Sequence, residues 1–193
     1  MRLVAILLAL VAVLVTNLAV SCGPADPTQA GGTEADPVSL LGVLPSPDDL
    51  RGPPAAEAGP AALLEALTGT ADAGLAGQLG ERGLKAAAVR TWTAPGGGEL
   101  VAAVSVWRSH LVATGIGSDA SARLAEEDGG GAWTPSEVPG GRGARLEGPR
   151  PERRLAYAVG PNSLYVRSTG DVDEDVVVRT MSRLILTQEG REG

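Results

Sequence analysis

Apolar residues between positions 84 and 107 have the spacing of two neighbouring β-strands. The segment 99–107 is apolar on both faces, which is typical of a strand covered on both sides of a sheet. The segment 84–93, with Val89 and Trp92, predicts another strand, and the glycine-rich turn at 94–98 makes the pair a hairpin. Shorter strands are predicted at 144–147, 154–159 and 163–168.

Helical spacing occurs on both sides of these strands. Leu63, Leu64 and Leu67 predict a helix over 61–67 that Gly69 ends, and 75–79 predicts a second short helix. Within 111–127 only the second half is predicted to be helical; its cap is one of two residues, Ser118 or Asp119. The glycines at 129–131 would end that helix. The best-defined helix is C-terminal, with an acidic start at Asp171, Asp173, Glu174 and Asp175 and an apolar face of Val177, Met181, Leu184 and Ile185.

The order helix, two strands, helix, two or three strands, helix predicts one α+β domain over 61–187. Its helices would pack against a mainly antiparallel sheet as an α/β sandwich, with strand 99–107 and the C-terminal helix at the centre. Residues 188–193 would form a short tail. This element order resembles that of small sensor or ligand-binding domains in actinobacterial lipoproteins and receptor-kinase ectodomains.

Residues 1–21 have the layout of a secretory signal peptide. Arg2 gives a positive start, and an unbroken apolar run covers 3–15 before a stretch of small residues. The signal ends on Leu18, Ala19, Val20 and Ser21, directly before Cys22. This stretch resembles the lipobox that the signal peptidase of bacterial lipoproteins recognises. The resemblance implies a diacylglycerol thioether on Cys22, cleavage before it, and a further acyl chain such as palmitate on the new N-terminus.

Two other outcomes are open for this segment. Ala19 and Ser21 also suit the ordinary signal peptidase, which would release the protein. An uncleaved helix over 3–20 would span about 27 Å, close to the roughly 30 Å of a bilayer core. Because the cysteine stands directly after Ser21, we expect a lipid anchor at the extracytoplasmic face of the cell membrane.

Residues 22–60 are rich in proline, glycine, alanine and acids. They show no sustained period, so we predict a mostly flexible linker and a folded core that begins near Ala61. The apolar run 38–44 leaves an alternative open, in which this piece docks on the domain as an arm.

Composition narrows the partners and cofactors. The formal net charge is −7, and removal of Arg2 with the signal peptide takes it to −8 (−7 − 1). An acidic exported domain has no general attraction to nucleic acid, so we expect no nucleic-acid partner. One histidine and one cysteine are too few for a metal site built on those ligands, and no metal or cofactor is predicted. The scarcity of lysine beside 27 glycines resembles the composition of proteins from high-GC bacteria such as actinomycetes.

Three short motifs resemble catalytic or binding sequences but are better explained structurally. A Ser-His-Asp triad would need His110 beside Ser109 or Ser105, which rarely gives the geometry, so we interpret His110 as the end of a strand. Residues 115–120 mimic a dinucleotide-binding glycine motif without an evident parallel βαβ unit. Residues 171–175 resemble the opening of a calcium loop, but its later ligands are missing, so we interpret them as a helix cap. No catalytic residue is predicted.

A group of arginines is the one candidate for contact with an anion or a partner. Its members are Arg142, Arg145, Arg150, Arg153 and Arg154. Guanidinium groups bind carboxylates and phosphates through paired donors. Glu147 and Glu152 interrupt the group, so a solvated and partly self-paired loop is the alternative.

The leading hypothesis is a non-enzymatic, membrane-anchored sensor or ligand-binding module. Its ligand or protein partner in the cell envelope is unknown. A small envelope hydrolase and a structural accessory subunit of an envelope complex are the alternatives. A groove between helix and sheet lined by Trp92, Trp107 or Tyr165 would favour the binding module. A deep polar pocket would favour the hydrolase, and an exposed apolar patch the accessory subunit.

Overall fold

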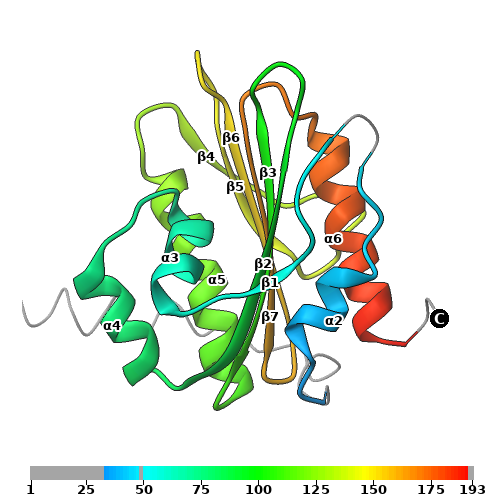
Figure 1. The fold of residues 1–193 in the computed structure, drawn as a ribbon. Coiled ribbons are helices and arrows are strands. Elements are labelled where there is room, and N and C mark those ends of the chain that lie inside the picture. Colours follow the sequence, from blue (N-terminus) through cyan, green and yellow to red (C-terminus); the bar gives the residue numbers. More distant parts are fainter. Residues whose placement is uncertain (1–32, 48–49, 191–193) are drawn as a thin grey trace, which may run out of the picture.

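The computed structural model describes residues 33–47 and 50–190, which form a seven-stranded sheet with helices on both faces (Figure 1). The strand order is β1-β2-β3-β7-β6-β5-β4, and every neighbouring pair is antiparallel. The strands are β1 Ala56–Glu57, β2 Leu84–Thr93, β3 Glu99–Trp107, β4 Gly130–Trp133, β5 Arg142–Leu146, β6 Glu152–Val159 and β7 Asn162–Thr169. The helices are α2 Pro37–Gly42, α3 Pro60–Thr68, α4 Ala73–Glu81, α5 His110–Ala125 and α6 Glu174–Gln188.

The helices divide into two layers. α3, α4 and α5 cover one face of the sheet, and α2 and α6 cover the other (Figure 1). This arrangement confirms the predicted fold class, an α+β domain with helices packed on an antiparallel sheet. β2 and β3 have the predicted bounds, and the turn between them makes the predicted hairpin.

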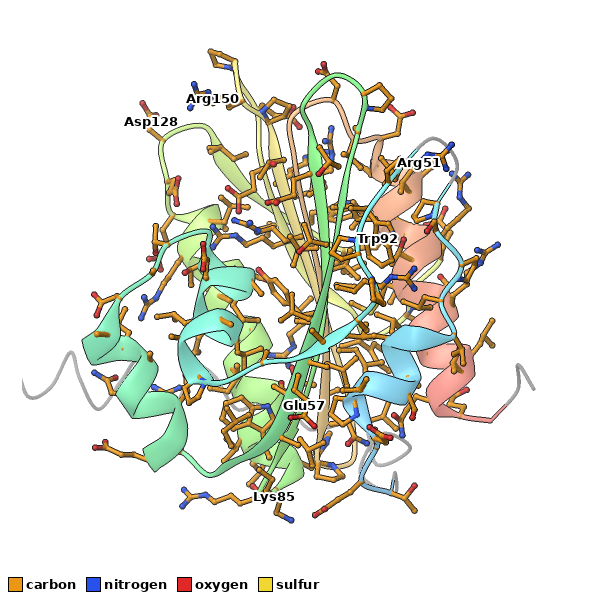
Figure 2. All side chains as sticks on the ribbon, viewed as in Figure 1. Arg51, Glu57, Lys85, Trp92, Asp128 and Arg150 are labelled. Carbon is orange, nitrogen blue, oxygen red and sulfur yellow. The ribbon has the colours of Figure 1, made fainter. Side chains whose placement is uncertain are left out.

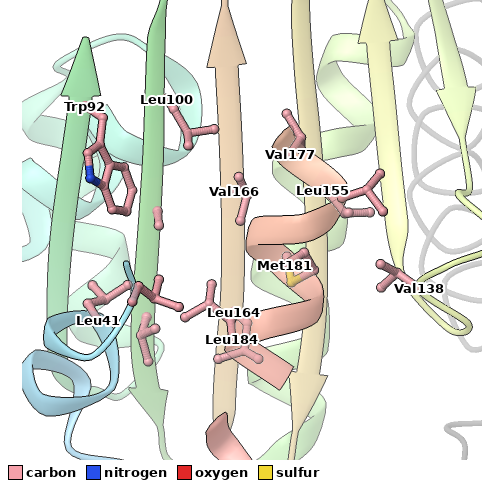
Figure 3. Packing of buried hydrophobic residues seen from close by; sticks show 14 of the residues in the cluster. Leu41, Trp92, Leu100, Val138, Leu155, Leu164, Val166, Val177, Met181 and Leu184 are labelled. Atoms are coloured by element: carbon pink, nitrogen blue, oxygen red, sulfur yellow. The ribbon is translucent and has the colours of Figure 1, made fainter. Parts of the chain in front are cut away.

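Each face of the sheet has its own hydrophobic core. Beneath α2 and α6, Leu41, Leu164, Met181 and Leu184 are completely buried (Figure 3). The core beneath α3 and α5 centres on Trp107, which is also completely buried. Residues 100–107 of β3 are all buried and supply side chains to both cores. The strand and the C-terminal helix therefore lie at the centre of the domain, as predicted.

The helix after β3 differs from the prediction. α5 begins at His110, and the Ser109 hydroxyl accepts a hydrogen bond from the Val112 backbone N–H at 3.4 Å. The cap is therefore neither Ser118 nor Asp119, and His110 opens a helix rather than ending a strand. The glycines at 115 and 117 concealed the first half, because glycine weakens a helical pattern. The glycines at 130 and 131 do not simply end the helix but begin β4.

The predicted linker is partly folded. α2 lies within it, and Leu40, Leu41, Leu44 and Leu50 are buried in the core beneath α6. For 38–44 the docked-arm alternative is therefore the correct one. The folded core begins before Ala61, because Ala35, α2 and β1 also contact the rest of the domain.

The remaining N-terminal predictions concern residues outside the described part. The signal peptide at 1–21, Leu18, Ala19, Val20, Ser21 and Cys22 all lie there, as do the last three residues of the predicted tail. Within 33–47 and 50–190, none of the helices has the length and apolar character needed to cross a membrane.

Candidate ligand cavity beside α3

The five arginines predicted as a recognition group do not share one face. Arg153 and Arg154 are neighbours on β6, so their side chains point to opposite faces of the sheet. Arg153 faces α6, where its Nη1 donates to the Val172 carbonyl at 3.3 Å and its Nε lies 3.6 Å from Glu174. The other three, Arg142, Arg145 and Arg150, are exposed.

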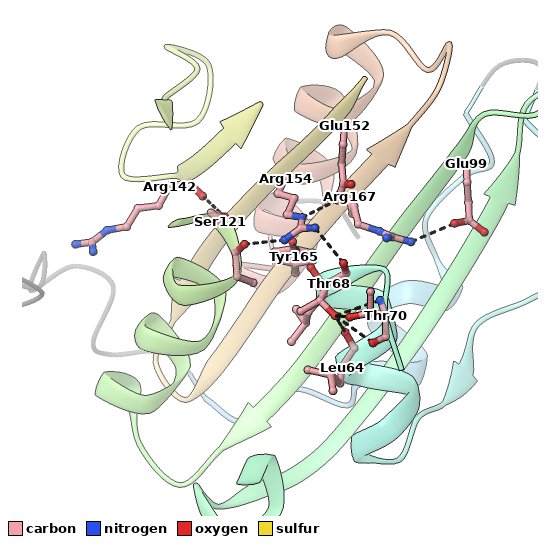
Figure 4. A network of polar contacts seen from close by, with 12 residues as sticks. Leu64, Thr68, Thr70, Glu99, Ser121, Arg142, Glu152, Arg154, Tyr165 and Arg167 are labelled. Atoms are coloured by element: carbon pink, nitrogen blue, oxygen red, sulfur yellow. Dashed lines mark hydrogen bonds and ion pairs between the residues drawn. The ribbon is translucent and has the colours of Figure 1, made fainter. Parts of the chain in front are cut away.

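Arg154 instead holds two helices onto the sheet (Figure 4). It is only 4% exposed, and its Nε donates to Glu152 at 2.6 Å. Its Nη1 donates to the Ala120 carbonyl at 2.9 Å, in α5, and its Nη2 to the Thr68 carbonyl at 3.0 Å, in α3. Every nitrogen of this guanidinium is therefore paired, and one of the final carbonyls of α3 gains a cationic donor.

Tyr165, two residues away from Arg167 on β7, binds the same end of α3. Its hydroxyl donates to the Leu67 carbonyl at 2.6 Å, and the residue is 1% exposed. Burial raises the pKa of the Tyr165 phenol above its ordinary value, although the nearby Arg154 opposes the shift. The phenol therefore serves as a fixed donor to the helix end.

Arg167 faces the same layer but has far fewer partners. It lies directly opposite Arg154 in the pairing of β6 with β7, and it is only 7% exposed. Its Nη2 donates to Glu99 at 3.2 Å, whereas none of the described residues accepts a hydrogen bond from its buried Nε. The charge of Arg167 is therefore paired with Glu99, but one buried donor of its guanidinium is unsatisfied.

The end of α3 leaves little room beside this arginine. Gly69 ends the helix in the left-handed region, with φ +76°, which glycine adopts readily. A Cβ atom there would lie 2.2 Å from Nη1 of Arg167. Both the backbone conformation and the close approach therefore require glycine at this position.

A cavity of about 260 Å³ opens between α3 and the sheet next to Arg167. Its walls are Ala62, Glu65 and Ala66 of α3, Val89 and Thr91 of β2, Glu99 and Val101 of β3, and Arg167 of β7. Thr91, Val101 and Arg167 lie side by side in the strand register. The cavity thus combines small apolar walls with one buried cation and two carboxylates.

Two other cavities in the described part are much smaller. One of about 60 Å³ lies among α3, α4 and α5 beside the ion pair of Arg82 with Asp119. Another of about 70 Å³ lies between the segment 44–47 and α6, next to Arg179 and Arg183. Of these three cavities, the one beside α3 is taken as the candidate ligand site, because a buried arginine lines it.

Sequence reasoning did not find this site. Arg167 and Glu99 were not singled out, although Arg167 stands two residues after Tyr165 and so shares its face of the strand. That alternation was the available signal. The groove lined by Trp92, Trp107 or Tyr165 that would have favoured a binding module is not found among the described residues, because all three are at most 1% exposed and none lines the cavity.

The three short motifs that resemble catalytic or binding sequences lie within or at the start of helices. Residues 115–120 lie inside α5, and His110 places its Nδ1 3.0 Å from the Gly160 carbonyl. Asp173 precedes the first residue of α6, and Glu174 and Asp175 lie in its first turn. Among residues 33–47 and 50–190, no group of three or more histidine, cysteine or acidic side chains is placed to hold a metal ion.

Comparisons with known proteins identify the fold alone. No family model matches the chain, and no curated protein matches it in sequence. The extracellular domain of PknH from Mycobacterium tuberculosis has a similar solved structure, with a TM-score of 0.57 and 10% sequence identity. The similarity covers 83% of this chain and 98% of that one.

Proposed function

We propose that this chain is a non-enzymatic ligand-binding or sensor domain, held at the outer face of the cell membrane by a lipid on Cys22. The observation that carries the proposal is the cavity beside α3, where Arg167 is buried with only one ion-pair partner. Ligand sites are typically concave, largely apolar and supplied with a few well-placed polar groups. This cavity is concave, half of its eight wall residues are apolar, and it contains one buried cation.

The position of the cavity suits a tethered receptor. Asn162 accepts from the Ala35 N–H and donates to the Thr33 carbonyl, which fixes the start of the described chain at the β6–β7 turn. Asn162 pairs with Val106, whereas Arg167 pairs with Val101, five residues further along β3. At about 3.4 Å per residue, the two points are about 17 Å apart along the sheet.

A chain that arrives from Cys22 would therefore join the domain away from the cavity. Figure 2 shows Lys85 near the joining end and Arg150 at the other end. Lys85 also forms an ion pair with Glu34, next to the joining point. With a lipid anchor on Cys22, the cavity would lie on the part of the domain that is further from the membrane.

The comparison in fold supports an extracytoplasmic location. The similar solved structure is the extracellular domain of a mycobacterial protein. The predicted signal peptide agrees with such a location. An exported domain with a pocket and a membrane tether fits the role of a receptor for a small molecule.

The lipid anchor is tested by intact mass. Protein extracted from native membranes should carry acyl mass on an N-terminal Cys22, and the Cys22→Ala variant should carry none. An unmodified mature chain, released into the medium by cells that express the wild type, would contradict the anchor.

The binding role is tested by what the protein carries. Protein purified from its native envelope in mild detergent is denatured, and the small molecules that it releases are identified by mass spectrometry. We expect a bound molecule with the wild type and with Arg145→Gln, whose side chain is exposed, but not with Arg167→Met. Identical results for the wild type and Arg167→Met would contradict a ligand site at the cavity.

A further inference from the structure

We infer that the cavity beside α3 binds a small zwitterion, a molecule that carries a carboxylate and an ammonium group on a short aliphatic frame. The inference rests on the proposed binding function and goes on to specify the class of ligand. It follows from the charges that line the cavity, from its volume and from its apolar walls.

Arg167 provides the place for the carboxylate. It is buried, it makes one ion pair to Glu99, and its Nε has no acceptor among the described residues. Arg154, directly opposite, differs in that all three of its nitrogens are paired, whereas the Nε atoms of Arg90 and Arg153 also lack an acceptor among the described residues. The Nε is shielded by protein atoms, so a ligand carboxylate would approach the terminal nitrogens of Arg167, of which Nη2 also pairs with Glu99.

The two carboxylates in the cavity wall provide the place for the ammonium group. Glu65 projects from α3 and Glu99 from β3, and the Glu99 side chain is 41% exposed. A simple anion at Arg167 would be repelled by both. A ligand with a positive group beside its carboxylate would turn that repulsion into attraction, because opposite charges a few ångströms apart stabilise each other.

The volume and the walls define the rest of the molecule. The cavity has a volume of about 260 Å³ and is partly open to solvent, so it suits a small molecule. The apolar wall consists of Ala62, Ala66, Val89 and Val101. Small and branched side chains of this kind favour a short aliphatic group, as in valine.

The test compares three probes of nearly equal shape. Valine has both charges, valinamide lacks the carboxylate, and isovalerate lacks the ammonium group. Radiolabelled probes are equilibrated by dialysis with the full chain, extracted from membranes in mild detergent and freed of bound small molecules. We expect saturable binding of valine below 10 mM and at least tenfold weaker binding of each of the other two.

Two variants separate the roles of the charges. Glu65→Gln should weaken valine at least fivefold, because it removes an attraction for the ammonium group, and should strengthen isovalerate, because it removes a repulsion of the carboxylate. Glu65 is exposed on α3, so its replacement does not disturb the core. Arg167→Met should abolish binding of both valine and isovalerate. Glu81→Gln, an exposed glutamate on α4 outside the cavity, is the matched control and should bind as the wild type does.

Each contrary result overturns the inference. No valine binding at 10 mM, equal affinity for valine and either analogue, or no effect of Glu65→Gln on the ratio of valine to isovalerate would do so. These results leave the proposed binding role testable on its own. If the native ligand has no ammonium group and its binding depends on Arg167, the inference of a zwitterion is wrong. The proposed binding role would then still hold.

Discussion

Arg154 and Arg167 are the same residue type on adjacent strands, yet their surroundings differ sharply. Sequence reasoning grouped Arg154 with Arg153 because they are neighbours in the chain, but the alternation of a strand sends them to opposite faces. Arg167 stood apart in the sequence and was missed, although it lies opposite Arg154 in the sheet. β6 and β7 are consecutive strands joined by a tight turn, so this pairing is a hairpin register that was not worked out from the sequence.

This contrast predicts different costs when each guanidinium is removed. Arg154→Met should lower the free energy of unfolding by about 3–5 kcal/mol, because it leaves Glu152 and two backbone carbonyls without their buried donor. Arg167→Met should cost less than about 1 kcal/mol, because Glu99 is partly exposed and water can replace its partner. Denaturant melts of both variants measure the difference. Equal losses would mean that Arg167 is as structural as Arg154.

At the scale of elements, α5 illustrates why a helix can escape sequence reasoning. Its two glycines broke the helical pattern, and they turn out to have different surroundings. A Cβ atom on Gly117 would lie 2.5 Å from Cβ of Ala156 in β6, whereas Gly115 has nothing within 4 Å of that position. Gly117 therefore lets the helix approach the sheet closely, which residues 115–120 alone did not indicate.

The two glycines should respond to alanine with opposite signs. Gly117→Ala should lower the free energy of unfolding by about 1–3 kcal/mol, the usual cost of overpacking. Gly115→Ala should raise it by about 0.5–1 kcal/mol, because alanine is the better helix former and has room. Denaturant melts give both values. The double variant Gly117→Ala with Ala156→Gly should recover part of the loss, and a further loss instead would show that the contact is not the cause.

α2 was predicted only as an alternative, since six residues are too few to form a stable helix alone. Contacts with the sheet stabilise this short helix. Arg90 of β2 donates to the Leu41 carbonyl at 3.1 Å and to the Leu44 carbonyl at 2.6 Å. Burial lowers the pKa of Arg90, and its guanidinium lies 4.7 Å from the centre of the Trp92 ring. These long-range contacts could not be foreseen from the composition of the segment.

Two neighbouring apolar residues test whether α2 is part of the core. Leu41 is completely buried and Val43 is 64% exposed. Leu41→Ala should therefore cost about 2–5 kcal/mol of unfolding free energy, and Val43→Ala less than about 0.5 kcal/mol. Both values come from denaturant melts. Near-zero effects of both substitutions would mean that this segment is not packed on the domain and behaves as the flexible linker that its composition predicted.

At the scale of the whole molecule, the sequence predicted the class of the fold but not its strand order. The hairpin of β2 and β3 followed from a short glycine turn, which is local information. The insertion of β7 between β3 and β6 is not local, and it is what brings Arg167 next to Glu99. The cavity therefore became visible only once α3, β2, β3 and β7 were placed together.

The two cores share their central strands and should therefore unfold together. β3 sends Leu100 to the core beneath α6 and Trp107 to the core beneath α3 and α5. If β3 leaves one core, the other core is exposed as well. We therefore expect this domain to unfold in one step, as most small single domains do. Leu184→Ala, in the core beneath α6, should cost about 2–5 kcal/mol.

Tryptophan fluorescence can follow each core separately. Trp92 belongs to the core beneath α6 and Trp107 to the opposite core. In variants that keep only one of the two, with Trp133 also changed to Phe, Leu184→Ala should shift the denaturant midpoint equally for both reporters. Arg150→Ala, at an exposed position, should change the free energy of unfolding reported by either tryptophan by no more than about 0.5 kcal/mol. Separate transitions for Trp92 and Trp107 would contradict a single folding unit and would allow the layer that carries the cavity to open by itself.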